Sequence, residues 1–338
     1  MSRVVYRSLG RRSSKVKVPP GAGLDNGVVS VGDGRVMIAT ADPISAIPAF
    51  GMELSAWLSV HLIASDYTSS GNDPEYAVFT YNFPAEMTEA DRTAYVRSVG
   101  EECDALGVAI AAGHTGSYPG SGFTVIGSGT MLGFASEGAY VAPSMARAGD
   151  VLVMTKHAAI EAAVSLATSF PESVGSRAGG KAVEKAMKLA RLCSTVADAR
   201  IARRVGLGVG GVTSMHDATE GGIMGALQEM ASASKKRFVV RPGLIPVTPE
   251  CKAVCGVFGL DPLRTMGEGA LLVTCDAGAL SRLRRTLGRA GIDATEIGVV
   301  RHGAGLYAEG ADGGERRVRA GPDMYWEAYA KAVRLGLR

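Results

Sequence analysis

Residues 215–231 read M-H-D-A-T-E-G-G-I-M-G-A-L-Q-E-M-A. The pattern predicts a short strand followed by a helix, with a double glycine at the helix start. The N–H groups of a helix start are free and its dipole favours anions, so phosphate is a natural ligand there. Neighbouring acids can hold Mg²⁺, which binds one or two carboxylates together with phosphate oxygens. In the alternative interpretation, Asp217 or Thr219 only caps the helix and Glu220 complements its dipole. The spacing of these residues does not distinguish a phosphate site from a helix cap.

Three other turns of the chain also carry acids. Asp25 and Asn26 lie in G-L-D-N-G, Asp42 ends a predicted strand in T-A-D-P, and Asp66 follows a predicted buried helix in A-S-D-Y-T-S-S-G-N-D-P. One acid of this kind is commonly a turn or cap residue. Four in one chain suggest acids that converge around Mg²⁺ and a polyphosphate, although neither composition nor periodicity places them together.

Other motifs argue against several familiar chemistries. Residues 206–211, G-L-G-V-G-G, match G-x-G-x-x-G, but they follow a predicted helix and precede a strand, the reverse of a dinucleotide fingerprint. We interpret them as a glycine-rich helix end. His114 lies in G-H-T after a predicted strand, where a lone histidine is usually structural. The chain has no P-loop, no Ser-His-Asp order and no H-E-x-x-H, so a nucleophile-triad or zinc hydrolase has little support.

The composition is that of a folded protein rather than a disordered one. The chain has 338 residues with 45 glycines, 46% apolar and 20% charged residues, and a formal net charge of +3. This balance does not indicate nucleic-acid binding. Five scattered cysteines predict buried free thiols in a reducing cytoplasm. We find no signal-peptide pattern and no apolar run long enough for a membrane span, so a cytoplasmic protein with no membrane contact is expected.

Two α/β (α+β) domains of similar size, joined near residue 147, are predicted from the order of elements. The expected division is a basic N-terminal arm (1–17), an N-terminal domain (18–146), a C-terminal domain (147–310) and a helical tail (311–338). The arm is either solvated and partly disordered or folds over an anionic ligand. The main expected elements are a hairpin over 28–42, strands at 76–83, 108–113, 123–133, 238–240, 270–275 and 294–300, and helices at 49–65, 88–107, 157–170, 181–205, 249–258, 279–291 and 324–335, with a Gly/Ser/Pro-containing stretch at 171–180.

The 215–231 segment resembles H-D-A-T-R-G-G-L-x-x-A-L-N-E-I-A, the signature of the hydrogenase expression/formation (HypE) family within the aminoimidazole ribonucleotide synthetase (PurM-like) superfamily. The resemblance extends over about residues 18–305. Looser matches occur in the family's order: L-D-N-G (24–27), A-S-D-Y-T-S-S-G-N-D-P (64–74), A-A-G-H-T (111–115), A-G-D-V-L-V-M-T (148–155), I-P-V-T-P-E (245–250), G-L-D-P-L (259–263) and G-E-G-A-L-L-V (267–273).

The resemblance implies a two-domain PurM-like fold whose N-terminal domains pair in a homodimer to form a shared β-barrel. It also implies ATP and Mg²⁺ in a cleft near the dimer interface, with the γ-phosphate moved onto an oxygen of a carbonyl or amide type of acceptor. The metal ligands would be Asp25, Asp42 and Asp66. The ATP-binding residues would be Gly21, Gly23, Asp25, Asn26, Thr115, Asp217, Thr219, Gly221 and Gly222. The catalytic residues would be Asp66, His114 near the transferred phosphate, and Lys17 on an arm that closes over the triphosphate.

The chain also departs from the HypE pattern. Members of that family carry the carbamoyl group on a C-terminal cysteine, whereas this sequence ends R-L-G-L-R and its last cysteine is Cys275. Asn26, His114 and Glu220 replace an aspartate, an aspartate and an arginine. We therefore expect a HypE-like paralogue with its own small-molecule acceptor. There are two alternatives. The first is a small-molecule kinase resembling thiamine-monophosphate kinase, and the second is a non-catalytic maturation or regulatory protein that binds a nucleotide. We also expect that the chain has a maturation protein as its partner.

Overall fold

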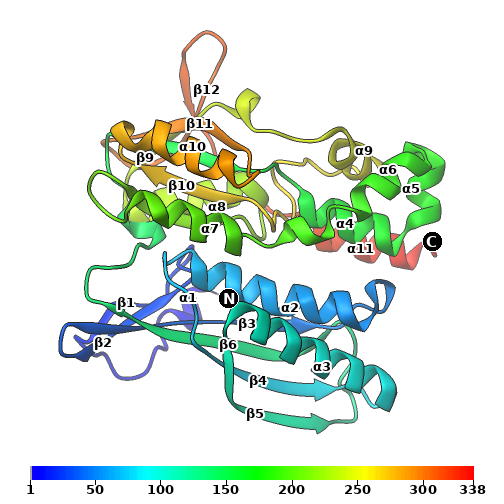
Figure 1. Cartoon of the computed structure of the whole chain (residues 1–338). Coiled ribbons are helices and arrows are strands. Elements are labelled where there is room, and N and C mark those ends of the chain that lie inside the picture. Colours follow the sequence, from blue (N-terminus) through cyan, green and yellow to red (C-terminus); the bar gives the residue numbers. More distant parts are fainter. Residues whose placement is uncertain (1) are drawn as a thin grey trace.

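A computed structural model describes residues 2–338, with Met1 outside the described residues. Two mixed sheets lie one above the other in Figure 1, each with its own helices, and the long helix α2 (Gly51–Thr68) lies between the two halves. This two-sheet α/β arrangement confirms the predicted fold class.

The N-terminal half is a six-stranded sheet of order β1-β2-β3-β6-β4-β5. β2 and β3 form the predicted hairpin, and β4 and β5 are parallel. The elements are α1 (Ser2–Val5), β1 (Val16–Val18), β2 (Gly27–Gly32), β3 (Arg35–Ser45), α2, β4 (Tyr76–Phe83), α3 (Glu89–Leu106), β5 (Ala109–Ser117) and β6 (Val125–Ser136).

The C-terminal half is a seven-stranded sheet of order β13-β12-β9-β11-β7-β10-β8, with β8 at one edge. The strands are β7 (Val151–Thr155), β8 (Val212–Asp217), β9 (Arg237–Val240), β10 (Leu271–Cys275), β11 (Ala294–Arg301), β12 (Gly305–Glu309) and β13 (Glu315–Arg317). The helices are α4 (Ile160–Ser169), α5 (Pro171–Ala178), α6 (Gly180–Met187), α7 (Val196–Ala202), α8 (Gly222–Ser234), α9 (Pro249–Val257), α10 (Leu280–Arg289) and α11 (Tyr325–Arg334).

Local chemistry explains the elements that were predicted best. The side chain of Thr88 accepts a hydrogen bond from the backbone N–H of Asp91 and so caps α3, and Gly107 ends that helix with a φ of 79°. Strand β4 alternates buried and less buried residues, as a strand with one face on a core does. Helix α2 has apolar residues on more than one face because it packs on both halves. Trp57 contributes to a cluster with Ile160 of α4, while the opposite side of α2 packs on the N-terminal sheet.

Some boundaries differ from the predictions. Asp66 lies in the last turn of α2 rather than after it, and His114 lies inside β5 rather than after its strand. The stretch 171–180 contains α5, and the single helix expected over 181–205 is interrupted by a 3₁₀ turn at Ala190–Cys193. That turn places Ala190 and Cys193 in the cluster around Trp57, and this tertiary packing overrides the local helical pattern.

All five cysteines are free and buried, as predicted. None of the helices within residues 2–338 is long and apolar enough to cross a membrane.

Candidate functional site

A pocket of about 610 Å³ lies where residues of both halves meet. Its wall combines the β1–β2 loop, β3 and α2 with α4, α8, α11 and the segment before β10. The charged lining is almost entirely acidic: Asp25, Asp42, Asp66, Glu161, Glu220, Glu229 and Glu268, with His216. Among the residues that the structure describes, no lysine or arginine lines this pocket. A polyphosphate bound here therefore needs metal ions, or cations from elsewhere, to neutralise its charge.

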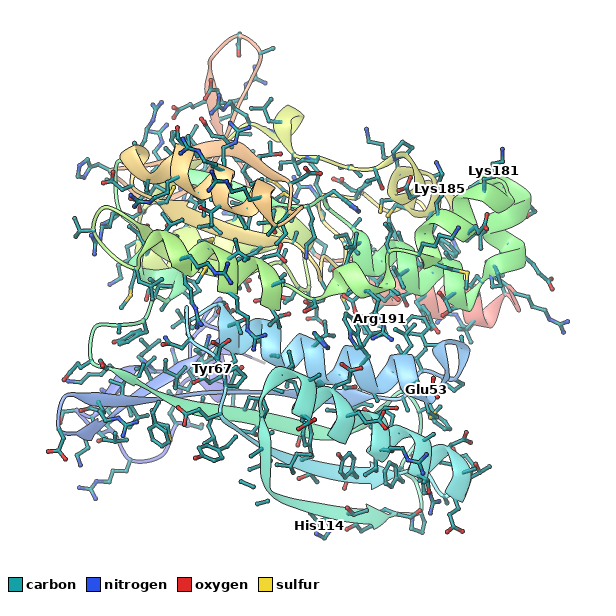
Figure 2. All side chains as sticks on the ribbon, in the orientation of Figure 1. Glu53, Tyr67, His114, Lys181, Lys185 and Arg191 are labelled. Atoms are coloured by element: carbon teal, nitrogen blue, oxygen red, sulfur yellow. The ribbon has the colours of Figure 1, made fainter. Side chains whose placement is uncertain are left out.

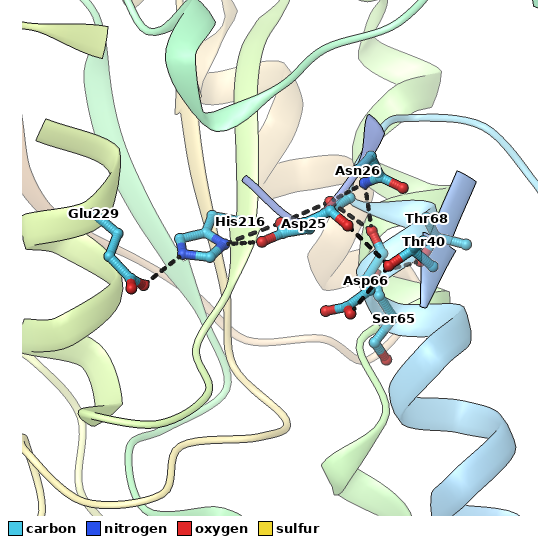
Figure 3. Close-up of polar contacts among 9 residues, drawn as sticks. Asp25, Asn26, Thr40, Ser65, Asp66, Thr68, His216 and Glu229 are labelled. Atoms are coloured by element: carbon cyan, nitrogen blue, oxygen red, sulfur yellow. Dashed lines mark hydrogen bonds and ion pairs between the residues drawn. The ribbon is translucent and has the colours of Figure 1, made fainter. Parts of the chain in front are cut away.

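One side of the pocket holds a carboxylate–imidazole–carboxylate network between the two halves (Figure 3). The Nδ1 atom of His216 is 2.8 Å from an oxygen of Asp25, and its Nε2 atom is 3.2 Å from Oε2 of Glu229. Burial opposes protonation of His216, but the two carboxylates outweigh it and raise the pKa of His216 well above its usual value. Because carboxylates engage both ring nitrogens, His216 holds Asp25 in place and has no free nitrogen to offer a metal ion.

Hydrogen bonds of Thr40 and Asn26 hold Asp66 near Asp25. The hydroxyl of Thr40 donates to the backbone oxygen of Asp25 at 2.8 Å and lies 3.3 Å from Oδ2 of Asp66 (Figure 3). The side-chain amide of Asn26 donates to the backbone oxygen of Asp66 at 2.7 Å. Asn26 thus orients the last turn of α2 through an N–H donor, a role that the aspartate found at this place in the family pattern could not perform in its ionised form.

Asp217 is the most buried acid beside the pocket, and it is not part of the pocket wall. It ends β8, its exposed fraction is 0%, and neither carboxylate oxygen has a hydrogen-bond partner among the described residues. Burial first, and then the charge of Asp25, raise the pKa of Asp217 to about 7. Burial and Glu220 likewise raise the pKa of Asp42 to about 6, and burial followed by Asp217 raises the pKa of Asp66. Crowded, buried carboxylates without a cation are the oxygen donors that Mg²⁺ prefers, so the residues fit this ion.

The start of α8 differs from the expected anion site. The N–H of Gly221 donates to Oδ2 of Asp323 at 2.8 Å, and the N–H of Gly222 donates to the backbone oxygen of Thr219 at 3.0 Å. Helix α8 has no side-chain cap from the chain before it; its N-cap is Gly221, at a φ of 83°. The expectation that these amides are free for phosphate is wrong because a carboxylate of the C-terminal tail already occupies one of them. The cap interpretation for Asp217 or Thr219 is wrong as well.

The pocket brings together six of the thirteen predicted site residues, and Asn26, Asp217, Gly221 and Gly222 are not part of its wall. Gly21, Gly23, Asp25, Asp42, Asp66 and Thr219 line it. Lys17 lies on β1, where its Nζ atom is 3.4 Å from Glu137, and it is not part of the wall. His114 lies on the outer strand β5 in Figure 2, and its ring is 2.7 Å from the hydroxyl of Tyr118. Thr115, on the same strand, borders a separate shallow groove. The functional roles of these residues stay predictions.

Sequence reasoning missed two further acids of the pocket wall, Glu161 and Glu268. Glu161 lies in the first turn of α4, where an acid is ordinarily a partner of the helix dipole. Burial raises the pKa of Glu161 to about 8, with Asp42 adding to it, and burial followed by Asp217 raises the pKa of Glu268. The sequence held a signal for Glu268, because this residue belongs to the segment G-E-G-A-L-L-V that matches the family pattern. It held no such signal for Glu161.

Comparison with known proteins agrees with this architecture. The N-terminal domain of AIR synthase related proteins matches residues 23–135, and the C-terminal domain matches residues 147–310. Carbamoyl dehydratase HypE of Cupriavidus necator is 28% identical over 286 residues, which cover 82% of this chain and 77% of the relative. Carbamoyl dehydratase HypE of Rhizobium leguminosarum bv. viciae is 29% identical over 254 residues, which cover 74% and 69%.

Solved structures share the fold at lower identity. AaThiL complexed with AMPPCP and TMP has a TM-score of 0.68 at 17% identity, covering 94% of both chains. A HypE–HypF complex has a TM-score of 0.69 at 20% identity, covering 94% of this chain and 97% of that chain. HypE in complex with ATP has a TM-score of 0.66 at 20% identity, covering 91% and 87%.

The two α/β halves and the acidic pocket between them define the class, a two-domain PurM-like enzyme. The chain belongs to the AIR synthase related protein family.

Proposed function

We propose that this chain binds ATP with Mg²⁺ in the pocket between its two halves and transfers the γ-phosphate to an oxygen of a small acceptor. The observation that carries the proposal is the buried carboxylate set, above all Asp217, whose oxygens have no partner within the described structure. Asp25, Asp42, Asp66 and Asp217 would hold the metal, which would neutralise the phosphates. The ATP complex of HypE and the AMPPCP complex of AaThiL, which share this fold, support the choice of nucleotide.

The residues of the pocket divide the work of such a transfer. Positioning and charge neutralisation supply most of the catalysis in phosphoryl transfer. His216 would hold Asp25 in place through its hydrogen-bonded ring. Gly21 and Gly23 allow close packing at the wall, because a Cβ at these positions would meet Leu24 and Glu229, respectively. A carbonyl or amide oxygen is the acceptor type that the names of the dehydratase relatives support. Direct phosphorylation, as in a small-molecule kinase, is the second candidate, supported by the likeness to AaThiL.

A homodimer is part of the proposal. Strand β5 is at the edge of its sheet, and all of its residues except Gly116 are exposed, Ile110 at 48%. An exposed edge strand of this kind is a ready surface for pairing with another chain. His114 lies on the same strand, far from the pocket of its own chain, so a role for His114 near the transferred phosphate requires a second copy that supplies the pocket.

The remaining expectations stand as proposals of the same kind. The likeness to a HypE–HypF complex supports a maturation partner protein, and buried free cysteines support a cytoplasmic location. We keep the division into an arm (1–17), two domains (18–146 and 147–310) and a tail (311–338).

Thermal unfolding in the presence of nucleotide tests the proposal. At a hundred times its dissociation constant, Mg-ATP should stabilise the folded chain by about 2.7 kcal/mol and raise Tm. Asp66→Asn should abolish this shift, whereas Asp104→Asn, an exposed aspartate of α3, should retain it. No shift in the wild type with any nucleotide would contradict the proposal. Product analysis then separates the two transfers, since a kinase leaves a phosphorylated acceptor and a dehydrating enzyme releases free phosphate.

A further inference from the structure

Helix α10 carries four arginines and no acid. Its two buried leucines pack in the core of the C-terminal half, while Arg282, Arg285 and Arg289 are exposed. These three residues are three and four positions apart, so they form one stripe along the helix surface. The fourth arginine, Arg284, donates from its Nε atom to the backbone oxygen of Ala294, at the start of β11, at 3.3 Å. The stripe is therefore a dense positive charge on a short helix.

A glycine-rich loop lies beside this stripe. The guanidinium of Arg282 donates to the backbone oxygens of Val205 and Gly210, both at 2.9 Å, and so joins α10 to the loop that follows α7. Helix α10 also packs on α7 and on the 3₁₀ turn that contains Arg204 (Figure 1). Arg204 is exposed, and Val209 in the loop is 84% exposed. We call the surface made of these exposed residues the arginine surface: Arg204, Val209, Arg282, Arg285 and Arg289.

The charge of the arginine surface is not neutralised within the described residues. The ion pairs of the C-terminal half use other arginines, such as Arg237 with Glu315, and none involves an arginine of this surface. The acid just before α10, Asp276, accepts a hydrogen bond from the N–H of Gly278. Like charges three or four residues apart destabilise a helix, so a purely structural role would favour neutral side chains here.

The composition of this surface favours a protein ligand over a nucleic acid. Proteins bind single-stranded nucleic acids largely by stacking the bases on aromatic side chains. Residues 196–212 and 277–292 contain no aromatic residue, and the formal net charge of the whole chain is only +3. Arginine pairs with carboxylates through two parallel hydrogen bonds and is enriched in protein–protein interfaces. Val209 adds an aliphatic contact beside the arginines.

We propose that the arginine surface binds an acidic segment of a partner protein, in which carboxylates alternate with aliphatic side chains. The carboxylates pair with Arg282, Arg285 and Arg289, and an aliphatic side chain of the segment packs on Val209. None of these residues lines the acidic pocket, so the inference does not depend on the proposed function.

A matched pair of labelled peptides tests this surface without knowledge of the partner. The acidic peptide E-E-L-E-E-L and its neutral counterpart Q-Q-L-Q-Q-L differ only in charge. Fluorescence anisotropy should show the acidic peptide binding the wild-type chain about tenfold or more tightly at low salt, with a smaller advantage at high salt because salt screens exposed charges. Equal affinities, or binding of neither peptide, would overturn the inference. Tighter binding of a labelled oligouridine with four phosphates would also overturn it, in favour of a nucleic acid.

Variants locate the site. The double variant Arg285→Gln/Arg289→Gln should bring the ratio of the two peptide affinities close to one. The control Arg97→Gln/Arg334→Gln removes two exposed arginines elsewhere and should keep the wild-type ratio. A ratio retained in the first variant, or lost in the control, would overturn the inference. The Tm of the first variant should be no lower than that of the wild type, because the substitutions remove like-charge contacts. A clearly lower Tm would give these arginines a structural role and would overturn the inference too.

Discussion

Replacing Asp217 by asparagine removes a buried acid whose oxygens have no hydrogen-bond partner among the described residues. The pKa of Asp217 is raised from 3.8 to about 7, so the folded chain keeps a proton that the unfolded chain releases between these pH values. Stability therefore falls as pH rises through this window. At 1.36 kcal/mol per pKa unit the full loss is about 4 kcal/mol, of which about 3 kcal/mol falls between pH 5 and pH 8.

Urea unfolding in EDTA at pH 5 and pH 8 measures this effect. The stability of Asp217→Asn relative to the wild type should improve by about 3 kcal/mol between pH 5 and pH 8. The unpartnered amide of the asparagine costs about 1–3 kcal/mol, but it costs the same at both pH values and cancels in the comparison.

Asp104→Asn is the control, since Asp104 is exposed on α3 and its replacement should give no such pH-dependent difference. If Asp217→Asn changes stability equally at both pH values, Asp217 is not a strained buried acid and the reasoning about the site fails.

Two further changes test the packing at the pocket and the edge of the sheet. A Cβ at Gly23, where φ is +70°, would lie 2.3 Å from Cβ of Glu229, whereas Gly34 has nearly the same φ, +67°, and open space. Gly34→Ala should lower the free energy of unfolding by about 1–2 kcal/mol, because alanine disfavours the left-handed backbone, and Gly23→Ala should lower it by clearly more. Equal losses in urea unfolding would show that the close approach between Gly23 and Glu229 is not rigid. Ile110→Lys on β5 should shift the chain from dimer to monomer in analytical ultracentrifugation, while Val209→Lys, 84% exposed in a loop, should not; a dimer in both variants would exclude the β5 edge as the interface.

The elements of the N-terminal half followed closely from local patterns. The alternation of β4 and the Thr88 cap and Gly107 end of α3 are signals that a few neighbouring residues carry. The same reasoning marked each site aspartate as an acid at the end of an element. It could not bring them together, because Asp25 and His216 are 191 residues apart and meet only when the two halves pack. The resemblance to a known family supplied that step.

The glutamates of the pocket wall show what the sequence leaves out. Glu161 is in the first turn of a helix, a position where an exposed acid is also common, so no local signal marks it as a residue of the pocket. The short strands β12 and β13 were missed because they carry no clear apolar alternation; they pair with each other as a hairpin, and β12 also pairs with the distant strand β9. At the start of α8, the double glycine predicted free amides, and Asp323, 102 residues further on, occupies one of them.

Calorimetric titration of ATP into the wild-type chain and Asp217→Asn, each with Mg²⁺ and with EDTA, tests the central claim most directly. If the buried aspartates hold the metal that neutralises the triphosphate, the wild type binds ATP with Mg²⁺ and loses most of its affinity in EDTA, and Asp217→Asn binds weakly under both conditions. Equal ATP affinity with Mg²⁺ and with EDTA, or full Mg-dependent binding by Asp217→Asn, would contradict the account.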